Sequence, residues 1–179
     1  MIAKYALAFR RYLRGVLVVS KKYDSSMPTV KFDKSQVTDS VRHDLRNNIE
    51  SLNDIASTDR TILYDVSLRA ILDGGDLRSL FQTLVGFGVA KQRARKIASY
   101  LSNNATILME AERREKMGIR YAIWRHSGAP CGEPEQDKAH KAADGKRFPV
   151  TQGLYINGRF ILPGKDFGCH CVSTSVLPY

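Results

Sequence analysis

The chain of 179 residues has few cysteines, one tryptophan and no long apolar run. Three cysteines are an odd number, which argues against the disulfide framework of a small secreted protein. The apolar run at residues 15–19 is too short for a signal-peptide core, and no run approaches the roughly 18 residues that span a bilayer. We therefore expect a protein that is cytoplasmic at synthesis and does not enter a membrane.

Acidic residues are also fewer than basic ones. The chain has 18 Asp and Glu and 28 Lys and Arg, which gives a net charge of +10. Residues 1–31 carry seven basic and one acidic side chain, and residues 89–120 carry eight and three. Such zones indicate contact with nucleic acid or an acidic protein surface, or simply solvated helix faces. The candidate contact residues are Arg10, Arg11, Arg14, Lys91, Arg93, Arg95 and Lys96.

Apolar residues recur at helical spacing through the first two thirds of the chain. This pattern predicts helices over residues 2–19, 37–55 and 59–71, and a short helix that Asp76 caps. Residues 20–34 are polar and are expected to form a linker. A long helix is predicted from Lys91 to Met117, with Gly118 ending it.

After Gly118 the pattern becomes typical of strands. Strands are predicted at residues 119–124, 148–150 and 172–177, and residues 154–162 predict a hairpin that turns at Asn157-Gly158. The sequence therefore predicts an α+β protein with a helical region at residues 1–118 and a small β-rich module at residues 119–179.

The β-rich module contains all three cysteines. Cys169 and Cys171 are one residue apart, so in a strand both thiols would point to the same face. With a third cysteine and a histidine brought near, they provide the ligand types of a tetrahedral zinc site, while Asp137 and Asp166 are candidate oxygen ligands or partners of the ligands. Packed apolar cysteines or one oxidised pair are the alternatives. The four candidate ligands are Cys131, His140, Cys169 and Cys171.

His140 also has an enzymatic interpretation, as the general base of a metal-dependent nuclease or toxin-like enzyme with Asp137 or Asp144. The sequence offers no complete catalytic set, and no known signature for a cysteine nucleophile surrounds Cys169 or Cys171. We therefore expect a protein that is not an enzyme. Trp124 is expected to anchor the core, and Asp144-Gly145 to form a tight turn.

Five motifs occur in a fixed order between residues 93 and 171. They are Arg93-Ala94-Arg-Lys-Ile97-Ala98, Gly118-Ile119 to Trp124, Trp124-Arg-His126-Ser127, His140 to Phe148 with Asp144-Gly145-Lys146, and Pro163-Gly164 to Cys169-His170-Cys171. In order and spacing, they resemble the phage Mu F-like head morphogenesis proteins, which are minor head or minor capsid proteins. The chain departs from that family at His170, where Arg is usual, and at Gln136-Asp137, where Pro-Arg is usual.

The resemblance implies a structural virion protein that acts in capsid assembly at or near the portal. It implies several copies in the head or at the portal vertex, and a host-cytoplasmic location during assembly. Portal and capsid proteins are the expected partners, with phage DNA as a further partner during packaging or ejection. The residues of the motifs with an expected structural role are Trp124, Asp144, Gly145, Pro163 and Gly164.

Overall fold

The computed structural model describes residues 34–74 and 76–177, and residues from 34 onward form one compact unit. The expected helix at residues 2–19 and most of the expected linker lie outside the described residues. So do Arg10, Arg11 and Arg14, the basic candidates of the N-terminal zone. None of the helices in the described part is long and apolar enough to cross a membrane.

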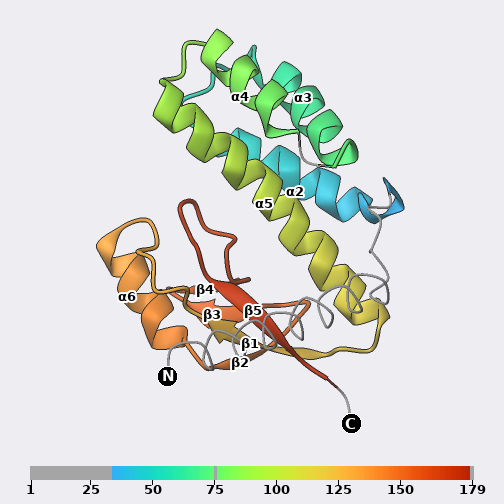
Figure 1. The fold of residues 1–179 in the computed structure, drawn as a ribbon, viewed down its shortest axis with the longest axis vertical. Coiled ribbons are helices and arrows are strands. Elements are labelled where there is room, and N and C mark those ends of the chain that lie inside the picture. The colour runs from blue at the N-terminus through green and yellow to red at the C-terminus, as the bar shows by residue number, and fades with distance from the viewer. Residues whose placement is uncertain (1–33, 75, 178–179) are drawn as a thin grey trace, which may run out of the picture. The chain divides into compact units, whose positions relative to one another are not determined.

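The first part of the described chain is helical (Figure 1). A short 3-10 helix, η1, precedes four α-helices, and α2, α3 and α4 all pack against α5. The elements are η1 (Lys34–Gln36), α2 (Asp39–Glu50), α3 (Arg60–Leu72), α4 (Leu77–Gly86) and α5 (Lys91–Lys116).

Helix α2 is shorter than the sequence predicts. It begins after Thr38, whose hydroxyl accepts the backbone N–H of Val41 at 3.4 Å, and it ends at Glu50 rather than at residue 55. Leu52 and Ile55 follow in turns, yet only 4% and 3% of their surfaces are exposed. The apolar spacing therefore predicted burial correctly and helix length wrongly, because residues in turns can fill the same core.

Helix α5 confirms the predicted long helix. Its 26 residues would measure about 39 Å at 1.5 Å per residue. One side is buried against the other helices, with Ala94, Ile97 and Leu101 fully enclosed. Gly118 has a φ of +75°, a left-handed conformation that suits glycine after a helix end.

The remaining elements form a small β-rich part, so the α+β class is confirmed. Strands β2, β1 and β5 form an antiparallel three-stranded sheet with β1 in the centre, and β3 and β4 form a separate hairpin. Asn157 and Gly158, with φ values of +50° and +84°, make the predicted hairpin turn. The strands are β1 (Tyr121–Arg125), β2 (Arg147–Pro149), β3 (Leu154–Ile156), β4 (Arg159–Ile161) and β5 (Val172–Val176).

Helix α6 (Pro134–Ala143) was not predicted from the sequence. Its signals are weak but present: Pro134 lies in the first turn with Glu135 and Asp137, and His140 and Lys141 lie in the last. The helix has only ten residues and little apolar content, so periodicity alone does not reveal it.

Two clusters of buried side chains fill the structure. The first joins residues 37–109 of the helices, and the second joins residues 119–171 of the β-rich part. Trp124 is 0% exposed at the centre of the second cluster, as expected of a core anchor. The division into two domains at residue 118 stays a prediction.

Candidate metal centre

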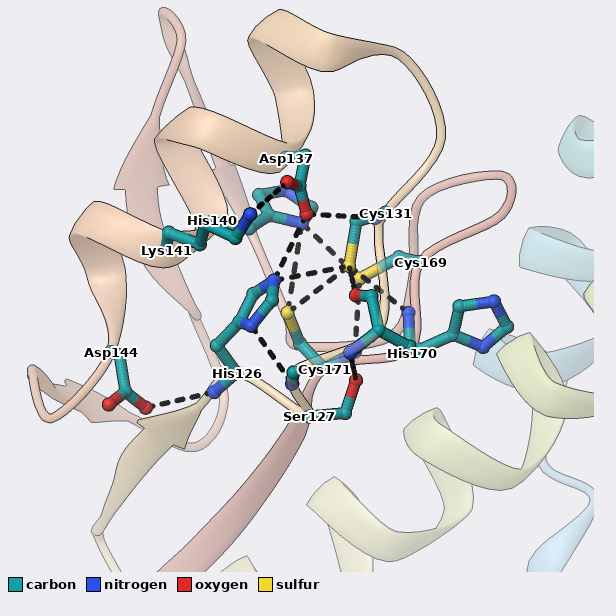
Figure 2. Close-up of polar contacts among 12 residues, drawn as sticks. His126, Ser127, Cys131, Asp137, His140, Lys141, Asp144, Cys169, His170 and Cys171 are labelled. Atoms are coloured by element: carbon teal, nitrogen blue, oxygen red, sulfur yellow. Dashed lines mark hydrogen bonds and ion pairs between the residues drawn. The ribbon is translucent and has the colours of Figure 1, made fainter.

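Four buried side chains converge in the β-rich part: Cys131, His140, Cys169 and Cys171 (Figure 2). They come from three segments. Cys131 lies in the loop between β1 and α6, His140 lies on α6, and the two other cysteines lie just before β5. Their exposed fractions are 0%, 1%, 8% and 4%, in chain order. These four residues could hold a metal ion, as the sequence predicted from their chemistry.

The distances within the cluster agree with tetrahedral coordination. Zinc bonds of about 2.3 Å to sulfur and about 2.05 Å to nitrogen place two sulfurs about 3.8 Å apart, and a sulfur and a nitrogen about 3.6 Å apart. The sulfurs of Cys131 and Cys171 are 3.6 Å apart, and Nδ1 of His140 lies 3.3 Å from Cys169 Sγ and 3.8 Å from Cys171 Sγ. A disulfide needs about 2.05 Å, and all three cysteines are free.

Cys169 and Cys171 do not lie in a strand, contrary to the prediction, because β5 begins only at Val172. They follow a turn in which the Cys169 N–H donates to the Asp166 carbonyl at 2.9 Å. Their sulfurs still converge, since both lie within 3.8 Å of His140 Nδ1. The exposed His170 side chain between them points away from the sulfurs (Figure 2).

The orientation of His140 is set from both sides of its ring. Nδ1 faces the sulfurs, and Nε2 lies 3.4 Å from Asp166 Oδ2. Because a carboxylate attracts a proton, Asp166 favours the tautomer that carries its proton on Nε2. The lone pair of Nδ1 is then free to bind a metal. Burial lowers the pKa of His140 and keeps the ring neutral. Asp137 and Asp144, the partners considered for an enzymatic His140, contact His126 instead.

Backbone N–H donors and burial have opposite effects on the pKa of the Cys169 thiol. The N–H of Cys171 donates to Cys169 Sγ at 3.4 Å, which favours the thiolate form of Cys169. Burial nevertheless raises the pKa of Cys169 to about 11, and burial also raises the pKa of Cys171. The protein alone therefore favours the neutral thiols of Cys169 and Cys171, and a bound cation would reverse that preference.

A second group of possible ligand atoms adjoins the first: His126, Cys131 and Asp137. The N–H of Gly128 donates to His126 Nδ1 at 3.0 Å, so the lone pair of that nitrogen is engaged. Nε2 then carries the proton of the neutral ring and donates to Asp137 Oδ1 at 3.1 Å. His126 therefore serves as a hydrogen-bond donor rather than as a metal ligand.

The Asp137 carboxylate accepts hydrogen bonds from three donors. Besides His126, it accepts the N–H of Cys131 at 2.9 Å and the ammonium of Lys141 at 2.7 Å. The Lys141 bond first, and then the Cys131 amide, hold the pKa of Asp137 well below its usual range. The side chain thus ties helix α6 to the Cys131 loop. The sequence offered only the W-x-H-S motif as a signal for His126.

Glycines let the two ligand-bearing loops approach each other. The N–H of Gly132 donates to the carbonyl of Gly168 at 3.1 Å, one residue from Cys131 and one from Cys169. Gly164, a residue of the P-G motif, has a φ of +85°, and a Cβ there would lie 3.0 Å from the Cys171 carbonyl oxygen. A side chain at Gly164 would therefore push against the backbone of a ligand.

The other motif residues have structural positions. Asp144 and Gly145 form the predicted turn after α6, where Gly145 has a φ of +77° and donates its N–H to the Trp124 carbonyl at 2.9 Å. Pro163 is buried beside Gly164. The Gly145 contact therefore connects the end of α6 to β1.

The basic residues at the start of α5 are not equivalent. Lys91, Arg95 and Lys96 are exposed, and Arg95 lies over the Phe81 ring at 5.6 Å. Arg93 forms an ion pair with Asp54 and lies 4.3 Å from the centre of the Phe167 ring. Arg93 is therefore engaged within the protein, while the other three remain candidates for an external contact.

Comparison with known proteins adds no family: no family model, no curated protein and no solved structure matches the chain. The resemblance to head morphogenesis proteins consequently rests on the sequence motifs.

Proposed function

We propose that Cys131, His140, Cys169 and Cys171 bind one zinc ion in a structural site. The observation that carries this proposal is the agreement between the measured ligand distances and those of tetrahedral zinc. Three sulfurs and one imidazole suit zinc, and four protein ligands leave no open position for a substrate. When bound, the ion supplies charge compensation for the buried thiolates.

We further propose that the protein acts as a minor head protein of a tailed phage or prophage, in capsid assembly near the portal. The ordered motifs between residues 93 and 171 support this role. A structural metal centre is compatible with this role, because it would stabilise a module too small to have an extensive core. DNA packaging and ejection are the later steps in which such a protein would take part.

The arrangement favours this structural role over the nuclease alternative. A general base must reach the proton that it removes. His140 is 1% exposed, its Nδ1 faces two sulfurs and its Nε2 faces Asp166. Neither ring nitrogen is open to a substrate, so we assign His140 to metal binding.

The zinc proposal is tested by elemental analysis and native mass spectrometry of protein purified without metal-affinity resin. We expect one zinc per chain in the natural protein and in His170→Ala, and less than one in Cys171→Ser. His170 is the matched control because it lies between two ligands and points outward. If the protein folds without metal and its thiols react freely, the zinc proposal is wrong, and the cysteines are clustered only because they are packed in the core.

The head-assembly proposal is tested in the phage that encodes the chain. Deleting the gene should leave major capsid synthesis intact and yield few infectious particles. Complementation with His170→Ala should restore the yield, and complementation with Cys171→Ser should restore it poorly. A deletion strain with a normal yield of fully infectious particles would contradict this role whether or not zinc is bound.

A further inference from the structure

The three-stranded sheet exposes one face to solvent in the part of the chain that the structure describes. Alternate residues of central strand β1 are buried, and the others face outward. Directly paired residues of an antiparallel sheet share a face, so the register assigns the same face to residues of β2 and β5. The outward residues are Tyr121, Ile123 and Arg125 of β1, Arg147 and Pro149 of β2, and Val172, Thr174 and Val176 of β5.

This outer sheet face, as we call these eight residues, contains exposed apolar side chains. Tyr121 is 40% exposed and Val172 is 57% exposed, and Ile123 lies half-buried between them. The guanidinium carbon of Arg147 lies 3.9 Å from the centre of the Tyr121 ring. Aromatic rings and guanidinium planes are the two protein groups on which unpaired bases stack.

The charged side chains of the outer sheet face have one sign. The eight residues include no Asp or Glu, and their two charged members, Arg125 and Arg147, are exposed. Arg120 and Lys146 pair with Val150 and Trp124 and therefore belong to the opposite face of the sheet. A face whose charges are all positive complements a phosphate backbone.

We propose that the outer sheet face binds a single-stranded nucleic acid. Bases would stack on the pair formed by Tyr121 and Arg147, and the positive charges of Arg125 and Arg147 would neutralise phosphates. A duplex offers its phosphates but hides its bases, so it would leave the Tyr121 ring without a stacking partner. The surface differs from the basic zone of α5, and its residues are not ligands of the proposed zinc ion.

The test uses the zinc-loaded full chain and a fluorescein-labelled 20-mer of deoxythymidine, with binding followed by anisotropy at several salt concentrations. Tyr121→Ala should weaken binding about five- to 150-fold, since a stacked base contributes about 1–3 kcal/mol, and Tyr121→Phe should keep most of the affinity. Arg125→Glu with Arg147→Glu should lower the slope of log affinity against log salt by about 1.4. Arg69→Glu with Arg78→Glu, at exposed positions of α3 and α4, is the control with an equal charge change.

Three outcomes would overturn the proposal. The first is that the 20-mer does not bind the protein at low salt. Tighter binding of the duplex with no effect of Tyr121→Ala would show a contact with phosphates alone. Equal displacement by polyglutamate would identify an acidic protein surface as the partner. Zinc content, measured on each sample, shows that a loss of binding does not come from a loss of metal.

Discussion

Cys131 is held at three points, which makes it the most constrained ligand of the proposed zinc site. Its sulfur faces that of Cys171 and accepts the N–H of His170, while its own N–H donates to Asp137. Since Asp137 sits on α6 together with His140, one carboxylate fixes the distance between two ligands. Groups that orient a ligand in this way commonly affect metal affinity 10- to 100-fold.

This arrangement predicts a graded effect of substitutions at Asp137. Asp137→Asn retains an oxygen that can accept the Cys131 N–H but loses the charge that attracts Lys141, whereas Asp137→Ala loses both. Zinc affinity, measured by competition with a chelator at neutral pH, should therefore fall slightly in the first variant and about 10- to 100-fold in the second. Glu135→Ala, an exposed acid on the same helix, is the control. Equal affinities for all three variants would leave Asp137 without a role in positioning Cys131.

The candidate ligands could be predicted from residue types, but the contacts that orient them could not. The C-x-C spacing indicated two convergent sulfurs, although the backbone reaches that result through a turn and not through a strand. Asp166 behind His140 and His126 beside Asp137 depend on how α6 and two loops are placed. No local pattern encodes those placements, because each arises from segments that are far apart in sequence.

At the scale of elements, α5 contributes most to the helical core. Leu101 is 0% exposed, and Leu101→Ala removes buried methyl groups and leaves a cavity that its helical neighbours can fill only in part. We expect the free energy of unfolding, measured with a denaturant, to fall by about 2–5 kcal/mol. Ile62→Ala on α3 is the control, because 51% of the Ile62 surface is exposed, and its effect should be much smaller. Similar losses for both variants would mean that the core assignment is wrong.

The predictability of the elements follows from how much local signal each one carries. Helix α5 has a long apolar stripe and a terminal glycine, and the β3–β4 hairpin has Asn157-Gly158, so both were predicted closely. Helix α6 has a mixed surface and depends on Asp137 and His140 for its contacts with the module. Its position is determined by tertiary contacts and not by its own periodicity.

At the scale of the whole molecule, one loop connects the proposed zinc site to the helices. Lys165 forms an ion pair of 2.5 Å with Asp44 of α2, and the Phe167 ring lies 5.1 Å from that of Tyr100 of α5. Asp166, between them, contacts His140. Metal binding and the seating of this loop on α2 and α5 are therefore expected to support each other.

Metal removal should consequently reverse the pH dependence of stability. With zinc bound, the thiolates and the neutral His140 are favoured in the folded state, so stability is lost as pH falls and protons displace the metal. Without zinc, burial raises the pKa of Cys169 from 9.0 to about 11. The unfolded chain then releases its proton first, and stability is lost as pH rises from about 9 to 11. Thermal melts with and without chelator at acid and alkaline pH would show both trends, and identical profiles would contradict them.

The spacing of the ligands along the chain has a topological consequence. Cys131 and Cys171 are 40 residues apart, and the segment between them contains α6, β2, β3 and β4. An ion that joins them closes this loop in the folded protein, and it stabilises the fold to the extent that it binds the folded chain more tightly than the unfolded one. The exposed turn at Thr151-Gln152 divides the ligands two and two, with Cys131 and His140 on one side. A single peptide-bond cut in that turn would thus leave two fragments that each contribute two ligands to one ion and that also remain paired through β1 and β5.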